Sequence, residues 1–444
     1  MVACRFVPSP MASSLVCVIA CAGVMANAPR AHATTYFVSI CGNDSNSGLT
    51  ANCGPAFGPK RTIQNAINTS ASGDVIIVFP GVYQEHINFG GRNITISGVK
   101  GADDTIIDGG GAQPSVVTFS SGETSAARLD GFTIRNGVGA SGFGGGMTIN
   151  GSSPTIANCI FTESDGVLQG PPAMYITNSA PLITACTFTA NQCVNGVVLL
   201  ISNNLTPLFQ DCIFSENAGN AIIYFQSSSL ALTRCRFLNN TSTFTVNARG
   251  SLFATHCVFS GNSGFAIYVD MDFAIVTVES STIVNNAGTL GSNFQVCTFA
   301  NCILRNNGPS EFLGVPPTVT YSNVKGGWPG TGNIDADPLF VNLAKGDLRL
   351  QTGSPCIDAG NSHRTVQQLI EFDLLGVSRL VDRPDVADTG ISFMSLTVDM
   401  GPYEVQAEPV VETCPADIAP SPGGNGIVNV DDLLDIINAW GVCS

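Results

Sequence analysis

A short pattern recurs through the middle of the chain and constrains its fold more than any other feature. It reads Cys, any residue, an aromatic or aliphatic residue, and then Asn three positions later, at intervals of 21–27 residues. Copies begin at Cys186, Cys212, Cys235, Cys257 and Cys302, and at Ser281 with Ser in place of Cys; weaker copies begin at Phe132 and Cys159. A repeat of this length cannot bury its apolar face alone, so neighbouring copies must stack. The pattern therefore predicts a solenoid.

The period within each copy predicts strands. Cys212 and Phe214 are two residues apart, so in an extended strand they share one face, while Asp211 and Ile213 point the other way. No helical pattern separates the copies, and 48 glycines with only 11% charged residues suit short strands joined by tight turns. We therefore predict an all-β parallel β-helix with internal Cys and Phe columns. Asn is expected at the bend after each strand, where it tolerates left-handed backbone angles.

Residues 1–33 are typical of a secretory signal peptide. Arg5 precedes an apolar run over residues 11–26, and small-residue cleavage sites end at Ala28 and Ala33. The run is too short for a membrane span and no stop-transfer segment follows it, so we predict a secreted or cell-surface protein without a transmembrane span. The net charge of −15 disfavours nucleic acid and acidic polysaccharide as electrostatic partners.

The cysteines divide into two groups. Those of the repeat are expected to pack as small buried hydrophobes, although neighbouring turns would also allow the Cα separations of ~4.4–6.8 Å that a disulfide spans. Cys41 with Cys53, and Cys414 with Cys443, are better candidates for disulfides, which export permits.

The segment before the repeats predicts a cap. Residues 61–68 place Ile63, Ala66 and Ile67 at helical spacing, and residues 73–78 form an apolar strand pattern. A short amphipathic helix here would cover the open end of the first turn, where core and strand edge are otherwise exposed.

Several segments resemble one family. They are Arg61–Gln64, Gly73–Val78, Pro80–Tyr83, Asn93–Gly98 and Thr105–Gly109 at the start, and Asn333–Phe340, Asp347–Leu350, Gly353–Gly360 and Val398–Glu404 at the end. Together they resemble secreted bacterial proteins of the pectin-lyase-like superfamily over residues 34–405. The resemblance implies a right-handed single-stranded parallel β-helix with an N-terminal capping helix. It says little about activity, because one scaffold carries many functions.

After Glu404 the sequence changes character. Residues 406–413 read as a linker, and residues 414–444 as a separate module in which 425–432 matches the second half of an EF-hand-like loop before a helix. This module resembles a single-repeat, Gly-Cys-terminated dockerin-like tail. The resemblance implies calcium ligands at Asp417, Asn425, Ile427 (through its carbonyl), Asn429 and Asp432. It also implies a sorting or anchoring receptor as a partner.

The tail departs from the motif in one respect. The loop from Asp417 to Asp432 is four residues longer than the twelve of an EF-hand, and its third ligand position is unfilled. A disulfide-closed helical hairpin without metal is therefore the alternative.

Two sets of residues are weak candidates for catalysis. Glu163 and Glu216 occupy equivalent positions two turns apart, or ~9.6 Å from the strand spacing, close to the ~6.5–9.5 Å between the carboxyls of an inverting glycosidase. Asp211, Arg234 and His256 fall on successive turns and would suit a lyase. The competing interpretation is a solvated bend for the first set and an exposed ion-pair column for the second.

Aromatic residues offer a binding surface. Tyr175, Tyr224 and Tyr268 recur on the strands between the Cys copies, where they would either stack against sugar rings or pack in the core. Trp328 is expected in an exposed loop.

Two functional hypotheses follow. The first is an exported, non-catalytic β-helix protein that binds a polysaccharide or a cell-surface component and is tethered by its tail. The second is a polysaccharide lyase or glycoside hydrolase, including one that acts on a uronate-containing polysaccharide.

Overall fold

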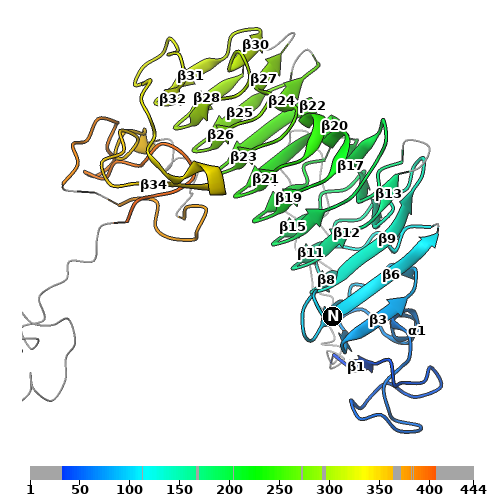
Figure 1. Ribbon diagram of the computed structural model, residues 1–444. Helices are drawn as coiled ribbons and strands as arrows, with labels where there is room; N and C mark the ends of the chain where they lie inside the picture. The colour runs from blue at the N-terminus through cyan, green and yellow to red at the C-terminus, as the bar shows by residue number, and fades with distance from the viewer. Residues whose placement is uncertain are drawn as a thin grey trace, which may run out of the picture. The chain divides into compact units, whose positions relative to one another are not determined.

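The protein winds as a solenoid whose parallel strands form three faces, here called faces 1, 2 and 3 (Figure 1). The structure is a computed structural model that describes residues 33–112, 114–166, 170–203, 205–271, 274–292, 297–363, 372–381, 383 and 385–406. Each turn of the solenoid contributes one strand to face 2, then to face 1, then to face 3. The predicted signal peptide and the predicted tail lie outside the described residues, except for Ala33.

Face 1 contains β1 (Thr35–Val38), β2 (Val75–Val78), β5 (Thr95–Gly98), β8 (Arg128–Asp130), β11 (Thr155–Ala157), β15 (Leu182–Thr184), β18 (Leu208–Gln210), β25 (Val276–Glu279), β28 (Thr298–Ala300) and β31 (Thr318–Thr320). Face 2 contains β4 (Ile87–Asn88), β7 (Val117–Phe119), β10 (Met147–Asn150), β14 (Met174–Thr177), β17 (Val197–Ser202), β24 (Phe265–Val269), β27 (Gly288–Ser292) and β30 (Phe312–Gly314). The long strands β20 (Ala218–Thr233) and β22 (Thr241–Thr255) pass through both faces and join them.

Face 3 is a separate sheet. It contains β3 (Gly81–Gln84), β6 (Thr105–Ala112), β9 (Thr133–Gly139), β12 (Ile160–Thr162), β16 (Thr187–Thr189), β19 (Ile213–Ser215), β21 (Arg236–Leu238), β23 (Val258–Ser260), β26 (Thr282–Val284), β29 (Ile303–Arg305) and β32 (Asn323–Val324). The short β13 (Asp165–Gly166) pairs with β9.

The predicted Phe column lies inside the solenoid. Phe161, Phe188, Phe214, Phe237 and Phe259 pair in register on adjacent strands of face 3. Their rings stack with centroids 4.6–4.8 Å apart and planes within 6° of parallel, and each ring is fully buried. The repeat pattern thus correctly identified both the strands and their inward face.

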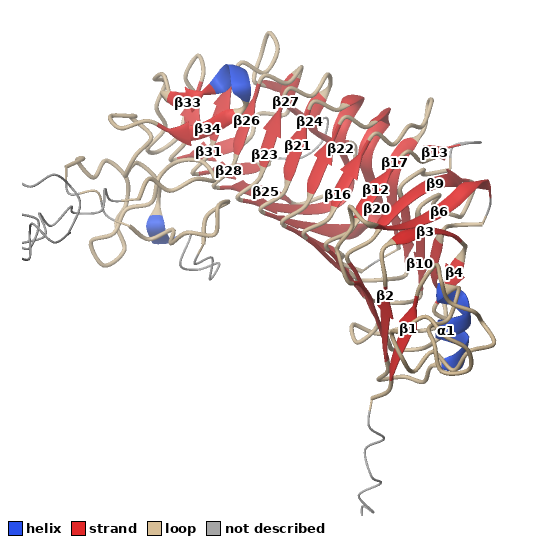
Figure 2. Cartoon of the chain, turned by 60° about the horizontal axis from the view of Figure 1, so that its bottom comes forward, coloured by secondary structure: helices blue, strands red, loops and turns tan. Residues whose placement is uncertain are grey.

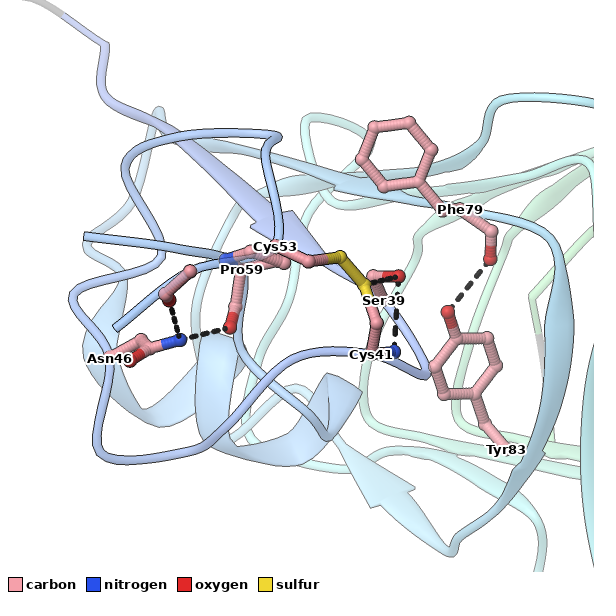
Figure 3. The surroundings of a disulfide bond; sticks show 8 residues. Ser39, Cys41, Asn46, Cys53, Pro59, Phe79 and Tyr83 are labelled. Carbon is pink, nitrogen blue, oxygen red and sulfur yellow. Dashed lines mark hydrogen bonds between the residues drawn. A yellow bond between two sulfur atoms is a disulfide. The ribbon is translucent and has the colours of Figure 1, made fainter. Parts of the chain in front are cut away.

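The predicted Cys column is also confirmed. Cys159, Cys186, Cys212, Cys235, Cys257 and Cys302 are buried and free of disulfides. Burial raises the pKa of the Cys302 thiol to about 12, so this thiol stays protonated. Cys41 and Cys53 form the predicted disulfide, and nearby Asn46 donates from its side chain to the Pro59 carbonyl (Figure 3). The predicted Cys414–Cys443 pair lies outside the described residues.

The Asn column bonds backbone groups, but it is buried rather than left-handed. Asn191, Asn217, Asn240, Asn262, Asn286 and Asn307 form an asparagine ladder with at most 4% exposure. From Asn191 to Asn286, each Nδ2 donates to Oδ1 of the next Asn at 2.8–3.1 Å. Each Asn Nδ2 also donates to a face 3 carbonyl one turn earlier. Glu311 accepts from Asn307 and ends the ladder.

The left-handed residue is the one before each Asn of the ladder. This column runs Ala190, Glu216, Asn239, Gly261, Asn285 and Asn306, with φ between 53° and 69°. A second left-handed column precedes each Cys position and includes Asp211, Arg234 and His256. The short bends therefore need αL backbone, which allows the Asn side chain to turn inward.

Both ends of the solenoid are capped. Helix α1 (Ile63–Thr69) buries Ile63, Ala66 and Ile67 as predicted, and Thr62 caps its N-terminus. At the other end Trp328 is half-buried, contrary to the expected exposed loop, because its ring packs edge-on against Phe312 at 4.5 Å. Among the described residues, no helix is long and apolar enough to cross a membrane.

The segment after the last turn folds back over the outer side of face 3. The 3₁₀ turn η1 (Leu343–Lys345) joins the antiparallel strands β33 (Phe340–Asn342) and β34 (Asp347–Leu350). Leu348 and Leu374 pack with Val258 and Val284 of face 3 in one buried cluster, which places β34 beside β23 and β26 (Figure 1).

Candidate functional site

A groove runs along the edge between faces 3 and 2, just after the asparagine ladder. It consists of two overlapping hollows of about 480 Å³ and 490 Å³, which share Gly219, Thr241 and Thr243. The first extends to residues 192–195 and the second to Phe265 and Ala287. The groove therefore spans consecutive turns of the solenoid, as a site for an extended ligand must.

The groove is lined by neutral polar groups. Amides come from Gln192, Asn195 and Asn220, and hydroxyls from Thr241 and Thr243. The described lining residues include no Asp, Glu, Lys, Arg or His. Cys193 also lines the groove, and burial raises the pKa of its thiol, which therefore stays uncharged at neutral pH.

The three tyrosines share one outward column of face 2, where β14, β17, β20, β22, β24 and β27 pair in that order. Figure 2 shows β17, β22, β24 and β27 in a row. The register runs Thr148, Tyr175, Leu200, Tyr224, Asn247, Tyr268, Gly291. Inward residues such as Ile176, Phe225 and Val269 alternate with them and are buried. The tyrosines are half-buried, so the surface interpretation applies and the core interpretation does not.

Aromatic and polar side chains continue the surface around the column. Phe244 stacks on Tyr268 with ring centroids 4.3 Å apart, and Phe265 lies 6.4 Å from Tyr268. Tyr224 donates to Gln226 at 3.0 Å. Since Phe265 also lines the groove, the groove and the tyrosine column form one continuous surface.

One ion pair lies on this surface. Arg249 donates to Asp270 at 2.7 Å and lies over the Tyr224 ring at 6.0 Å. Hydrogen bonding to Asp270 raises the pKa of Arg249, which is therefore charged at all relevant pH values.

The glutamates considered for catalysis lie at solvent-exposed bends. Glu163 and Glu216 are in the left-handed column two turns apart, with Ala190 between them, and neither lines the groove. Glu163 lies 3.9 Å from Arg135, whose guanidinium bonds Asp108 at 2.8 Å. Hydrogen bonds from Asn136, Gly110 and Arg135 outweigh burial and lower the pKa of Asp108, so this acid is ionised.

The second candidate set divides between surface and interior. Asp211 and Arg234 form a two-pronged ion pair at 2.6 and 2.9 Å, which lowers the pKa of Asp211 despite its partial burial. His256 is fully buried, and among the described residues neither ring nitrogen has a hydrogen-bond partner. The expected exposed column therefore stops at Arg234.

His256 lies close enough to Arg379 of the returning C-terminal segment for the charge of Arg379 to act on it. Burial is the largest cause that holds the pKa of His256 well below its usual value, and the positive charges of Arg379 and Arg234 lower it further. Arg379 is fully buried and pairs with Glu404 at 3.2 Å, and burial raises the pKa of Glu404 well above its usual value. Burial likewise raises the pKa of Asp399 to about 6.

This buried ionic cluster was not predicted from the sequence. In the sequence, Val398–Glu404 only contributes to the resemblance described above, and no local pattern shows that its carboxylates lie near Arg379. The cluster is closed to solvent and holds the segment in place.

Metal sites are not found in the part of the chain that the structure describes. No group of three or more His, Cys, Asp or Glu side chains there is placed to hold an ion. The predicted calcium ligands Asp417, Asn425, Ile427, Asn429 and Asp432 lie outside the described residues.

Comparison with known proteins identifies the architecture. Residues 116–283 match the family described as "Right handed beta helix region". The chain contains a right-handed parallel β-helix. No curated protein matches this β-helix chain.

Solved structures with a similar course of the chain include the pectate lyase Pel9A, with 15% identity, a TM-score of 0.44 and coverage of 84% of this chain and 96% of that one. A pectin methylesterase from carrot has 14% identity, a TM-score of 0.40 and coverage of 69% and 90%. XylC, in complex with xylose, has 12% identity, a TM-score of 0.35 and coverage of 84% and 99%.

Proposed function

We propose that the β-helix binds an extended polysaccharide along the groove and the tyrosine column. The observation that carries the proposal is the outward column with Tyr175, Tyr224 and Tyr268 on every second turn, next to a groove lined by amides and hydroxyls. A sugar ring offers an apolar face to an aromatic ring, and its hydroxyls bond to neutral polar side chains. A column along the solenoid repeats this combination, as a polymer requires.

Binding to purified protein tests the proposal. Y224A/Y268A removes two rings that each contribute about 0.5–1.5 kcal/mol beyond area burial, so we expect at least tenfold weaker binding in affinity electrophoresis against a polysaccharide panel. F253A is the matched control, because Phe253 is an exposed aromatic residue on face 1. Binding of Y224A/Y268A equal to that of F253A would refute the proposal.

Catalysis on a polysaccharide remains the second candidate. Arg135, between Asp108 and the exposed Glu163, is the arrangement that favours it. Release of reducing ends or unsaturated uronates from the same panel, lost in E163Q, would establish an enzyme. Binding without release supports a binding protein.

We also propose that the protein is exported and tethered through its tail. The support is the sequence of residues 1–33 and of residues 414–444. Calorimetric calcium titration of the full chain and of D432A tests the metal site, and cell fractionation with and without residues 414–444 tests the receptor.

A further inference from the structure

The strand that follows the aromatic surface carries a glycine opposite each of two rings. Gly288 pairs with Phe265, and Gly291 pairs with Tyr268. A Cβ on Gly291 would lie 2.7 Å from Cδ2 and 3.2 Å from Cε2 of Tyr268, and a Cβ on Gly288 would overlap the Phe265 ring. Both glycines are buried although they are on the outer side of the sheet. The two rings therefore lie across β27 and cover its backbone.

Backbone conformation does not require these glycines. Neither has a positive φ, so alanine fits the backbone of this strand and only the rings exclude it. The missing side chains thus make room for Phe265 and Tyr268 to lie over the next strand. Rings held in this way are a preorganised surface for stacking.

The spacing of the column defines which units of a polymer meet a ring. Tyr175, Tyr224 and Tyr268 are separated by two turns each, or ~9.6 Å at the strand spacing. Leu200 and Asn247 occupy the turns between them. An extended chain that lies along the solenoid axis therefore meets a tyrosine at alternate steps.

The charge of the surface selects against anionic chains. A polyuronate carries one negative charge on each sugar and needs cations to bind it. Arg249 is held by Asp270 at 2.7 Å, the described groove lining is uncharged, and the whole chain carries a net charge of −15.

We propose that the ligand is an uncharged polysaccharide whose alternate sugar rings stack on the tyrosine column, with Phe265 and Tyr268 as the principal subsite. This inference rests on the proposed function and specifies its substrate class. The ion pair between Arg249 and Asp270 keeps the column neutral and excludes uronates.

A comparison of neutral and anionic polymers tests the inference. The intact protein is titrated with hydroxyethylcellulose and glucomannan, and with polygalacturonate and alginate, at about 0.15 M salt with EDTA to remove bridging cations. We expect at least tenfold tighter binding of a neutral polymer. Binding of a uronate as tight as that of the neutral polymers overturns this inference and leaves the proposed function standing. Binding of none of the four overturns both.

G291A tests the stacking subsite, and D270A tests the selection against anionic polymers. G291A displaces the Tyr268 ring and is expected to weaken neutral binding about tenfold, whereas G54A, where a Cβ meets nothing within 4 Å, leaves it unchanged. D270A removes the ion-pair partner of Arg249 and is expected to gain polygalacturonate binding. If both G291A and Y268A bind the neutral polymers as tightly as wild type, the assignment of the principal subsite is overturned. If D270A still does not bind polygalacturonate, the role of the ion pair is overturned.

Discussion

The asparagine ladder gives a sharp test of what stabilises the solenoid, and N240D is the substitution of choice. Nδ2 of Asn240 donates to the Phe214 carbonyl at 2.8 Å and to Oδ1 of Asn262 at 2.9 Å. Its Oδ1 accepts from the backbone and the side chain of Asn217, both at 3.1 Å. Asp has the same shape, so the change keeps both accepted bonds, removes both donated bonds and creates no cavity.

The expected loss of stability follows from the two hydrogen bonds that Asn240 no longer donates. Each buried hydrogen bond contributes about 0.5–1.5 kcal/mol, and a buried acceptor left without a donor costs about 1–3 kcal/mol. We therefore expect N240D to lower the free energy of unfolding by about 2–4 kcal/mol at pH 8. Burial will raise the pKa of the new carboxyl, and the protonated acid can donate one bond again. The raised folded-state pKa adds stability as the pH falls, so the loss should be smaller at pH 5.

Urea unfolding at pH 8 and pH 5, with hydrogen exchange of the neighbouring turns, measures this. The matched control is N239G, since Asn239 is exposed and has a φ of 53°, and since the equivalent position in the next turn is already a glycine, Gly261. We expect the control to change stability by less than about 0.5 kcal/mol. N240D that unfolds at the same urea concentration as N239G would show that the ladder does not stabilise the fold.

Two further predictions concern the buried C-terminal cluster. The low folded-state pKa of His256 means that stability is complete above its unfolded value of about 6.5 and falls as the pH drops below it. H256N, which suits the left-handed backbone, should therefore lose less stability than wild type between pH 7.5 and 5 in urea unfolding, and equal losses would contradict this. R379M leaves Glu404 buried without its partner and should cost about 3–5 kcal/mol with faster proteolysis of the returning segment. The double variant R379M/E404Q should recover part of that loss, and a double variant less stable than R379M would argue against the pairing.

The solenoid was predictable because its signal is periodic. The spacing of Cys212 and Phe214, repeated turn after turn, specifies both strands and the inward face. The backbone conformation at each bend could not be predicted, because the sequence does not reveal whether Glu216 or Asn217 takes the left-handed conformation. The structure assigns it to Glu216, and the Asn side chain then points inward.

The candidate site was only partly predictable. Tyr224 and Tyr268 recur along the sequence, but successive residues of a strand point to opposite faces. Because the turns before these strands differ in length, the sequence does not show which face each tyrosine occupies. Their outward direction therefore required the structure. Arg379, whose charge acts on His256, belongs to a segment more than 100 residues later in the sequence, and no local pattern places it there.

A crystal structure of the β-helix with a neutral oligosaccharide would show whether sugar rings stack on the tyrosine column. We expect sugar rings over Tyr224 and Tyr268, two turns apart, with the oligosaccharide along the solenoid axis. An oligosaccharide bound on face 1 or face 3, with the tyrosine column bare, would contradict it.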